Sequence, residues 1–501
     1  MEARNRSGQS YVVVVREALS SGAYLMRALF RCDASISVGT GHVMRCLSFS
    51  DTLRWAGWHC AFLTNPEARS IVPALERDAI DLVDSVAGAA FDLAVVDHYG
   101  LDAHYERALA NTNARVVVFD DLADRPHDCS VLVDSTPEPR EQIYRASGAP
   151  TTRLLLGPRY AMIVDSWLSR RRAARDRLAR GGKIERLFVS MGGTDPNNAT
   201  GRVLAALAAA RLDVHVDVVL GPQSPHRDAI LRTQNEWLAV HVAHPEIAAL
   251  AAEADLAIGA SGTSCFERAV LGLPSILIPL ADNQRCLANA FAAAGAAEIL
   301  EPETLDMPMV VAERVSALAL DSERRMRMSR RAAVLTDGRG RLRLLAAIAG
   351  ESKTRSGEGV TLRLVELEDE AWLLELQRQK ATRQFARNPI VPSASEHAAW
   401  FGAAVEDHRL LTIIMSGERP CGMLRLDRLP GSKPTFEISI AVDGRSQRTG
   451  VARAALTLAR QLAPGADLVA MVKPDNAPSL ALFAAAGYEA EGDDLYRSRA
   501  A

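Results

Sequence analysis

The pattern that most constrains the fold of this chain is an alternation of short apolar runs with stretches of helical periodicity. From Met26 to about residue 165 the apolar runs read RALFRC, CAFLT, FDLAVVD, ARVVVFDD and CSVLVDS, and helical patterns such as HVMRCLSFSDTLRWAG lie between them. Strands that alternate with helices in this way build βαβ units around a parallel sheet. The sequence therefore predicts a Rossmann-like N-terminal lobe over residues 26–165.

A second series of the same kind follows a basic helical stretch, SRRRAARDRLAR. Its apolar runs include ERLFVSMGG, VHVDVVLG, ADLAIGAS and SILIPL, and Ala-rich helical patterns separate them. We therefore predict a second Rossmann-like lobe over residues 166–350. Ligands of doubly wound sheets bind at the carboxyl ends of the strands, so we expect the two lobes to face one another across a cleft.

The end of the chain follows a different plan. The polar stretch ESKTRSGEGV favours a linker over residues 351–359. From residue 360 to 501 the pattern runs through a strand, two helices, three strands, a glycine-bearing loop that leads into a helix, a further strand and a last helix, which predicts an α+β domain. Residues 1–25 are poorly patterned and are interpreted as an N-terminal extension. Met26 is expected to begin the folded part and is a candidate for the translation start.

Composition and charge restrict the partners. The chain has 501 residues, 48% of them hydrophobic, and a formal net charge of −3, so it offers neither a basic stripe for nucleic acid nor a polybasic membrane face. The seven cysteines are widely spread, without a close pair that could hold zinc, which favours a reducing compartment. Since no apolar run approaches the about 20 residues of a membrane span, we expect a cytoplasmic protein without metal, membrane or nucleic-acid partners.

The stretch VGTGHVMR, residues 38–45, is the first candidate site. Gly39 and Gly41 remove side chains where a strand turns into a helix, so that backbone amides can approach an anion, and Arg45 follows one turn later. His42 stands at the mouth of this turn. A neutral imidazole can take a proton from water, which suits a general base for hydrolysis beside a phosphate. The alternative is a tight turn in which His42 only caps or packs.

The second lobe carries two more loops of this type, each directly after a strand, in SMGGTDPNN and GASGTSCFERAV. Glu267 lies one helical turn beyond the second loop, where an acid can accept hydrogen bonds from ribose hydroxyls, or can simply lie on a solvated helix face. Short polar groups after a later buried strand can reach a sugar. The candidate substrate-binding residues of this lobe are Gly192, Gly193, Ser261, Gly262, Thr263, Glu267, Asn283 and Gln284.

Together these motifs make residues 26 to about 350 resemble the UDP-sugar hydrolases of pseudaminic acid biosynthesis, relatives of the GT-B glycosyltransferases. The motifs that carry the resemblance are RCDASISVGTGHVMRC, VVDHYGLD, VVFDDLADRPHDCSVLVD, SMGGTDPNN and GASGTSCFERAVLGLPSILIPLADNQ. The resemblance implies metal-free removal of UDP from a 2,4-diacetamido-2,4,6-trideoxy-altropyranose, by attack of water at the anomeric carbon.

The resemblance also implies roles for particular residues. His42 matches the catalytic base, Asp97 and Tyr99 match positions near the sugar, and Ser261, Thr263 and Glu267 match the UDP side. Asp33, beside the first turn, is a further substrate-binding candidate, although it could instead cap the local backbone.

The C-terminal domain resembles the GNAT acetyltransferases. QRTGVA, residues 447–452, fits the Q/R-x-x-G-x-G/A loop whose backbone amides hold the pyrophosphate of coenzyme A, and KPDNAPSLALFAAAGYE fits the family's later strand and closing helix. The resemblance implies acetyl-CoA as co-substrate. The candidate cofactor-binding residues are Gln447, Arg448, Thr449, Gly450, Val451, Ala452, Asn476 and Ser479.

The catalytic groups of this domain are less clear from the sequence. Many GNAT enzymes have a tyrosine, acting as general acid, at the position of Phe483, so we expect Tyr488 or a water to substitute, or acid catalysis to matter less. Packing is the alternative for Tyr488. Glu437 stands where a base that deprotonates the amine is often found, or is an exposed strand residue. His397 and Trp400 could line an acceptor pocket or belong to the core.

The two resemblances suggest consecutive steps on one UDP-linked amino sugar, N-acetylation of its 4-amino group and then hydrolytic release of UDP. The sequence leaves three alternatives open. The two lobes could form a glycosyltransferase in which a sugar replaces water as acceptor. They could form a sugar-nucleotide sensor without turnover. The acetyltransferase could act on another amine.

Overall fold

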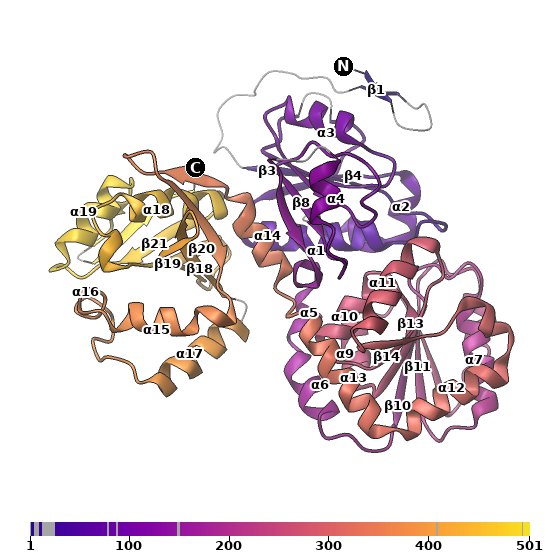
Figure 1. Ribbon diagram of the computed structural model, residues 1–501. Helices are drawn as coiled ribbons and strands as arrows, with labels where there is room; N and C mark the ends of the chain where they lie inside the picture. Colours follow the sequence, from indigo (N-terminus) through magenta and orange to yellow (C-terminus); the bar gives the residue numbers. More distant parts are fainter. Residues whose placement is uncertain are drawn as a thin grey trace. The chain divides into compact units, whose positions relative to one another are not determined.

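Figure 1 shows the computed structural model of the chain, which describes residues 2–4, 10–12, 26–77, 80–86, 89–147, 151–406, 409–492 and 494–500. Within the stretch 1–25, which was expected to lack pattern, β1 (Glu2–Arg4) and β2 (Ser10–Val12) pair in antiparallel fashion. The aromatic and β-branched residues of β2 favour this extended pairing. The rest of the predicted extension lies outside the described residues.

The N-terminal lobe is built on a seven-stranded sheet in the order β5-β4-β3-β6-β7-β8-β9. The strand order reverses between β3 and β6, and their carboxyl ends therefore define a binding edge. The strands are β3 (Arg27–Cys32), β4 (His59–Leu63), β5 (Asp81–Leu82), β6 (Leu93–Asp97), β7 (Arg115–Phe119), β8 (Val131–Asp134) and β9 (Arg153–Leu156). The helices are α1 (Gly41–Trp55), α2 (Pro66–Ile71), η1 (Pro73–Glu76), α3 (Ala103–Ala110), α4 (Glu141–Ala146) and η2 (Pro158–Tyr160).

The second lobe has a six-stranded parallel sheet in the order β12-β11-β10-β13-β14-β15, which reverses between β10 and β13. Its strands are β10 (Arg186–Ser190), β11 (His215–Leu220), β12 (Leu238–Val242), β13 (Leu256–Ala260), β14 (Ser275–Ile278) and β15 (Ala297–Ile299). Its helices are α5 (Asp165–Leu168), α6 (Arg171–Leu178), α7 (Ala199–Ala210), α8 (Arg227–Leu231), α9 (Ile247–Glu253), α10 (Ser264–Val270), α11 (Asp282–Ala293), η3 (Pro302–Asp306), α12 (Pro308–Leu320) and α13 (Ser322–Leu335). The next helix, α14 (Gly340–Ile348), leads into the C-terminal unit, which includes the chain from Leu342 onward.

This second sheet is covered on both faces. Two apolar clusters of buried residues, one around Val203 of α7 and one around Phe266 of α10, are each built from strand and helix side chains. Because all its strands are parallel and covered by helices, they read as nearly continuous apolar runs. That is why the sequence pattern located this lobe.

The C-terminal sheet is mixed, in the order β16-β17-β18-β19-β20-β21-β23-β22, and only the β20–β21 pair is parallel. The strands are β16 (Glu351–Lys353), β17 (Gly359–Leu364), β18 (Leu410–Ser416), β19 (Arg419–Arg428), β20 (Thr435–Val442), β21 (Asp467–Met471), β22 (Glu489–Ala490) and β23 (Leu495–Ser498). The helices are η4 (Leu367–Asp369), α15 (Glu370–Arg378), α16 (Lys380–Arg383), α17 (Ala394–Glu406), η5 (Gly444–Ser446), α18 (Val451–Leu462) and α19 (Ala477–Ala485).

The parallel pair in this sheet opens along its length. β20 and β21 are paired only from Thr435 opposite Asp467 to Glu437 opposite Val469, although β20 continues to Val442. The two strands therefore separate beyond Glu437. Helix α18 follows β20 and helix α19 follows β21, so both helices start after the end of the sheet at which this pair is open.

The boundary between the second lobe and the C-terminal domain differs from the predicted one. Part of the stretch 351–359, for which the sequence predicts a linker, is strand β16, an edge strand that pairs with β17. An edge strand buries little, so its polar, exposed sequence resembles that of a linker.

The chain divides into two compact units, and each combines distant stretches of sequence. The first contains both lobes, with Leu29–Ser50 and Cys60–Arg341, whereas the second contains Asp51–His59 together with the chain from Leu342 onward. Within this second unit the ring of Trp55 meets the ring of Phe436 edge-on, with centroids 4.7 Å apart. The second unit therefore includes residues far upstream of 360.

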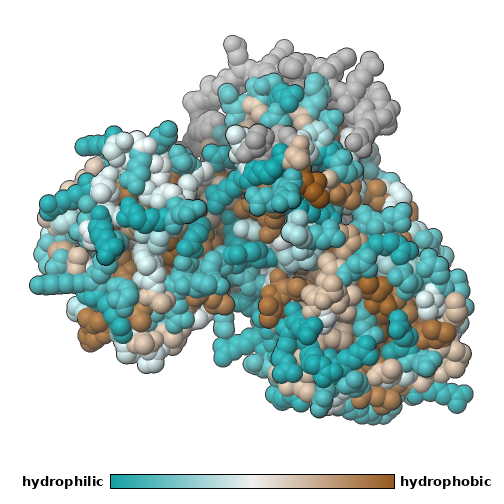
Figure 2. Space-filling model, viewed as in Figure 1, coloured by the Kyte–Doolittle hydropathy of each residue, from teal (hydrophilic) through white to brown (hydrophobic). Residues whose placement is uncertain are grey.

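The predicted fold class, two Rossmann-like lobes followed by an α+β domain, is confirmed by these sheets. Figure 2 shows a mainly hydrophilic face on which hydrophobic residues lie in small groups. None of the helices in the described part of the chain is long and apolar enough to cross a bilayer.

Candidate functional site

His42 is held by a buried carboxylate at the binding edge of the first sheet. It is the second residue of α1, which follows β3, and Asp97 is the last residue of β6, so the strand reversal brings the two together. His42 Nδ1 lies 2.6 Å from Asp97 Oδ1. When Nδ1 carries the proton and donates a hydrogen bond to Asp97, Nε2 is unprotonated and can accept a proton. This arrangement suits a base that removes a proton from water.

Arg45 neutralises the same carboxylate. Its Nε donates to Asp97 Oδ2 at 2.5 Å and its Nη2 donates to Asp97 Oδ1 at 2.7 Å. Burial alone raises the pKa of a carboxyl, but the charge of Arg45 holds the pKa of Asp97 well below its usual range. Asp97 therefore remains ionised behind His42.

This geometry gives Asp97 and Arg45 partners within the protein. Asp97, expected near the sugar, is fully buried, and its oxygens face His42 and Arg45. Arg45, expected beside an anion, is 8% exposed and is occupied by carboxylates. A buried guanidinium needs a paired anion, and the protein supplies one itself. Both residues therefore hold His42 in place.

Tyr99 and Asn283 stand next to the histidine. The rings of His42 and Tyr99 meet edge-on with centroids 4.4 Å apart, and Asn283 Nδ2 of the second lobe donates to the Tyr99 hydroxyl at 3.0 Å. Burial is the main reason that the pKa of Tyr99 lies above its usual range, so its hydroxyl stays protonated. The predicted residues His42, Tyr99 and Asn283 therefore form one group.

The glycine loops of the two lobes also meet. A Cβ built on Gly193 would lie 2.8 Å from Thr40 Oγ1, and one built on Gly41 would lie 3.6 Å from Thr263 Oγ1. Gly39 has φ +85° and Gly192 has φ +88°, a backbone conformation that L side chains rarely adopt. Gly193 and Gly41 therefore leave room for the side chains of Thr40 and Thr263, and Gly39 and Gly192 permit the local backbone conformation.

In one predicted phosphate loop, side chains of the loop itself bind the first amides of the following helix. Asp195 of the GGTDPNN stretch accepts hydrogen bonds from Ala199 N at 2.8 Å and Thr200 N at 2.9 Å, and Asn198 Oδ1 accepts one from Gly201 N at 3.2 Å. These are the first amides of α7, which an anion would otherwise use. The loop of Gly192 and Gly193 consequently lacks a free helix end.

Glu267 and Ser261 have the character expected of ligand-facing groups. Ser261 is fully buried, and its Oγ has no hydrogen-bond partner within the described residues. Glu267, the fourth residue of α10, is half-buried, and burial raises the pKa of its carboxyl to about 7. The interpretation of Glu267 as a fully solvated residue does not fit this environment. Gln284 lies nearby and accepts a hydrogen bond from Leu280 N at 3.1 Å.

Asp33 lies in a separate network. Its carboxylate binds Arg31 Nη2 at 3.0 Å, His98 Nε2 at 3.1 Å and the backbone nitrogen of Asn65 at 2.8 Å. Burial opposes ionisation, but His98 and Arg31 hold the pKa of Asp33 below its usual range. The alternative that Asp33 caps local backbone is the one that these contacts favour.

Asp121 was missed by sequence reasoning. Its Oδ2 accepts a hydrogen bond from Arg45 Nη1 at 3.3 Å, and its Oδ1 is buried without a partner among the residues described. It follows β7, the neighbour of β6, at the same edge of the sheet. The second aspartate of VVVFDD could have indicated it, because acids at the carboxyl ends of parallel strands face the binding edge.

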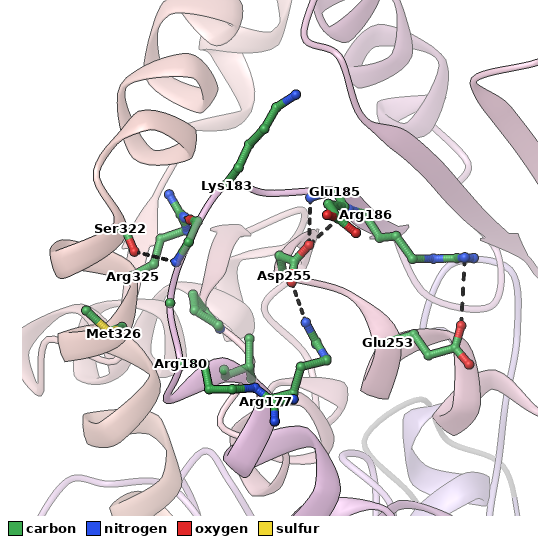
Figure 3. A pocket seen from close by; sticks show the side chains of 14 residues that line it. Arg177, Arg180, Lys183, Glu185, Arg186, Glu253, Asp255, Ser322, Arg325 and Met326 are labelled. Atoms are coloured by element: carbon green, nitrogen blue, oxygen red, sulfur yellow. Dashed lines mark hydrogen bonds and ion pairs between the residues drawn. The ribbon is translucent and has the colours of Figure 1, made fainter.

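A pocket of about 230 Å³ lies elsewhere, next to the amino ends of β10, β13 and β14 (Figure 3). Arg177 is ion-paired with Asp255, and Arg186 Nη1 lies 3.8 Å from Glu253 Oε2. Because its charged side chains largely satisfy one another and it lies at the edge opposite His42, this pocket is not part of the candidate site.

The pyrophosphate loop predicted in the C-terminal domain has suitable geometry. Gly450 is the N-cap of α18 with φ +93°, and no side chain caps that helix start among the described residues. The amides of the first turn are thus left for an anion. Arg448 also has positive φ, +63°, Val451 is buried, and Thr449 Oγ1 donates to Ser446 O at 2.7 Å. Gln447 and Thr449 are exposed, and Ala452 lies in the first turn of α18.

The second predicted cofactor element is the start of α19. Asn476 is its N-cap, and its Oδ1 accepts a hydrogen bond from Ser479 N at 3.2 Å. The side-chain oxygen of Asn476 therefore has a structural function. α19 follows β21 and α18 follows β20, so both predicted cofactor elements border the opening between these strands.

The predicted catalytic groups of this domain differ in environment. Glu437, the last residue of β20 that pairs with β21, forms an ion pair with Arg387. Tyr488 is 6% exposed, and its hydroxyl has no hydrogen-bond partner within the described chain. Burial raises the pKa of Tyr488 to about 12, and its ring packs edge-on against Phe483. His397 is buried and packs with Phe401, as the core alternative expected.

Comparison with known families agrees with this division. Residues 187–340 match the glycosyltransferase family 28 C-terminal domain, and residues 360–489 match the acetyltransferase (GNAT) domain. The chain thus joins a glycosyltransferase-28-like nucleotide-sugar domain to a GNAT acetyltransferase domain.

Three curated proteins are distant relatives. The uncharacterized protein MJ1062 of Methanocaldococcus jannaschii is 21% identical over 52% of this chain, which spans only 57% of that relative's length. The spore coat polysaccharide biosynthesis protein SpsG of Bacillus subtilis is 24% identical over 63% of this chain and 96% of its own. UDP-2,4-diacetamido-2,4,6-trideoxy-beta-L-altropyranose hydrolase of Campylobacter jejuni is 25% identical over 37% of this chain and 68% of its own.

Two solved structures are also similar. Acinetobacter baumannii MurG has 16% identity, covers 64% of this chain and 98% of its own, and gives a TM-score of 0.47. Mycobacterium smegmatis RimJ in complex with CoA-disulfide has 21% identity, covers 30% of this chain and 85% of its own, and gives a TM-score of 0.27.

Proposed function

We propose that the first unit hydrolyses a UDP-linked 2,4-diacetamido-2,4,6-trideoxy-altropyranose to the free sugar and UDP. The observation that carries the proposal is the hydrogen bond between His42 and Asp97 at the strand reversal. The distant similarity to the Campylobacter hydrolase supplies the substrate class.

In this reaction His42 acts on water. Its Nδ1 hydrogen bond to Asp97 fixes the ring, and Nε2 accepts a proton as the water oxygen bonds to the anomeric carbon. The bond from that carbon to the UDP oxygen breaks, and UDP leaves with the bonding electron pair. Arg45 keeps Asp97 ionised, so that Asp97 stabilises the imidazolium that forms.

The second lobe is proposed to hold UDP. The loops that start at Ser261 and at Gly192 border the site, and the Glu267 carboxylate is suited to accept hydrogen bonds from the ribose hydroxyls. Tyr99 and Asn283 lie where they can contact the sugar beside His42.

We further propose that the GNAT domain N-acetylates the 4-amino group of the UDP-linked precursor with acetyl-CoA. The free helix start at Gly450 suits the CoA pyrophosphate, and a bound acetyl-CoA would supply the acetyl group. Glu437 can accept the proton of the amine once its ion pair with Arg387 opens, and Tyr488 can donate to the thiolate that leaves.

One incubation tests both proposals. The full-length protein is mixed with acetyl-CoA and a UDP-4-amino-4,6-dideoxy-AltNAc substrate, and the acetylated intermediate, free sugar and UDP are followed together. We expect acetylation followed by UDP release. Absence of both products would refute the proposed function.

A second candidate for the first unit is a glycosyltransferase. The match of residues 187–340 to a glycosyltransferase domain favours this alternative. Incubation with the acetylated UDP-sugar and no acceptor distinguishes the two reactions, because only a hydrolase forms stoichiometric free sugar and UDP. Stoichiometric binding without turnover would instead indicate a sensor.

A further inference from the structure

The turn that precedes the GNAT domain lies against its candidate cofactor loop. Strands β16 and β17 form a hairpin, and β16 lies beside helix α18. A Cβ built on Gly450 would lie 3.4 Å from Thr354 Cβ and 3.7 Å from the backbone nitrogen of Arg355. The hairpin turn is therefore a neighbour of the N-cap of α18, although it lies outside the matched residues 360–489.

The turn is held in one conformation by its own hydrogen bonds. Thr354 is 7% exposed, and its Oγ1 accepts a hydrogen bond from Glu358 N at 3.1 Å and lies 2.9 Å from Ser356 Oγ. The backbone adds bonds from Gly357 N to Thr354 O at 3.0 Å and from Thr354 N to Glu358 O at 2.9 Å. A fixed turn holds the backbone of Arg355 beside the helix start.

Arg355 belongs to a group of cations without acidic partners. It is exposed, and the described part of the chain contains no recorded hydrogen bond or ion pair to its side chain. The same holds for the side chains of Arg448 and Arg453 in the loop and first turn of α18. The nearby acid Glu358 is engaged by Ser416 and lies 3.8 Å from Arg419.

A surplus of positive charge beside an uncapped helix start calls for an anion with more than one charge. CoA carries a pyrophosphate and a 3′-phosphate, and guanidinium groups bind such oxygens in a fixed fork geometry. We propose that Arg355, from the hairpin before the GNAT domain, binds a phosphate of CoA and so completes the cofactor site. This inference rests on the proposed use of acetyl-CoA.

Calorimetric titration of the full-length protein with CoA and with 3′-dephospho-CoA tests the inference without any acceptor. Arg355→Ala is expected to weaken CoA binding about tenfold, the usual effect of losing one charge-assisted contact. Lys353→Ala is the matched control, because it removes the same charge from the same hairpin and should change binding less than twofold. Arg355→Lys should recover part of the loss.

The two ligands identify the phosphate. A loss seen only with CoA assigns Arg355 to the 3′-phosphate, and an equal loss with both ligands assigns it to the pyrophosphate. The inference is overturned if Arg355→Ala binds both ligands as the parent does, or if Lys353→Ala loses as much. Failure of the parent protein to bind CoA would overturn the proposed acetyltransferase chemistry itself, and the inference with it. Thermal unfolding of each variant confirms that it is folded.

Discussion

His42 is the proposed general base of the hydrolysis, and replacing it should affect the rate of the reaction but not the binding of UDP. His42→Asn should lower the rate of UDP release by about 10² to 10⁴, the usual contribution of a general base, and should leave UDP affinity within about twofold. The control is His104→Asn, an exposed histidine at the start of α3. Release within about threefold of the parent rate would reject His42 as the base.

The raised pKa of Glu267 leads us to expect that nucleotide binding depends on pH. The pKa of its carboxyl is raised to about 7 in the folded protein, whereas hydrogen bonds from ribose hydroxyls require the ionised form. UDP affinity should therefore fall as the pH drops from 8 to 6. The ratio of the parent Kd to that of Glu267→Gln, measured across this range, cancels the titration of the UDP phosphate. A constant ratio would contradict the assignment.

The buried ion pairs of His127 lead us to expect that the stability of the folded protein depends on pH. Its Nδ1 lies 2.7 Å from Glu106 Oε1, and its Nε2 lies 3.4 Å from Asp120 Oδ2. Burial opposes its charge, but Asp120 and Glu106 raise the pKa of the imidazole to about 9. A raised pKa means that this stabilisation, about 3 kcal/mol, is complete below about pH 6.5 and is lost as the pH rises through 9.

Urea unfolding of the parent protein and of His127→Gln, at several pH values between 6 and 10, measures this contribution. The difference in unfolding free energy between the two proteins should be largest at pH 6 and should shrink toward pH 10. A difference that does not change with pH would show that His127 is neutral in the folded state.

Among single residues, the sequence located candidate residues that lie together, but it did not give their partners. His42 and Tyr99 do meet, because strand ends at a reversal of strand order share one edge, and Asn283 of the second lobe contacts Tyr99. The partners of Asp97 and Arg45 were not predictable, since a pairing between residues 52 positions apart depends on the folded arrangement of side chains. The same reason explains why Asp121 was missed.

At the level of secondary-structure elements, α7 offers a direct test of helix capping. Asp195 accepts hydrogen bonds from two first-turn amides of α7 and is 3% exposed. Asp195 is not the N-cap itself, which is Asn198, but its loss leaves the same kind of first-turn amides without an acceptor. Asp195→Ala should therefore reduce the free energy of unfolding by about 1 to 2 kcal/mol, as the loss of a capping side chain does. Asp228→Ala, in the exposed first turn of α8, is the control and should change it by less than about 0.5 kcal/mol.

Helices and strands could be predicted where the pattern of apolar residues in the sequence was strong. Buried parallel strands such as β13 and β14 read as continuous apolar runs, and the sequence identified both. β16 was taken for a linker, because an exposed edge strand of three polar residues has no hydrophobic signal. The hydrogen bonds of Asp195 to the first turn of α7 could not be predicted for a different reason. A glycine-rich loop before a helix can bind an anion, or an acidic side chain of the loop can bind the first amides of the helix instead.

For the molecule as a whole, the division into two compact units determines where the chain can be divided into stable fragments. A break at residue 360 follows the sequence pattern, but it removes β16, and it separates Glu366 from Arg343, whose Nη2 lies 2.7 Å from Glu366 Oε2. Residues Asp51–His59 also belong to the second unit, and a C-terminal fragment lacks them.

We therefore expect the fragment 360–501 to be less stable than the fragment 342–501, which keeps β16 and the Arg343–Glu366 ion pair. Both fragments should be less stable than the same unit in the full chain, because they leave Phe436 without the ring of Trp55. Urea unfolding followed by far-UV circular dichroism gives the midpoints of the fragments, and Trp55→Ala in the full chain isolates the aromatic contribution. Equal midpoints for the two fragments, together with no effect of Trp55→Ala, would show that the domain from residue 360 onward is independent.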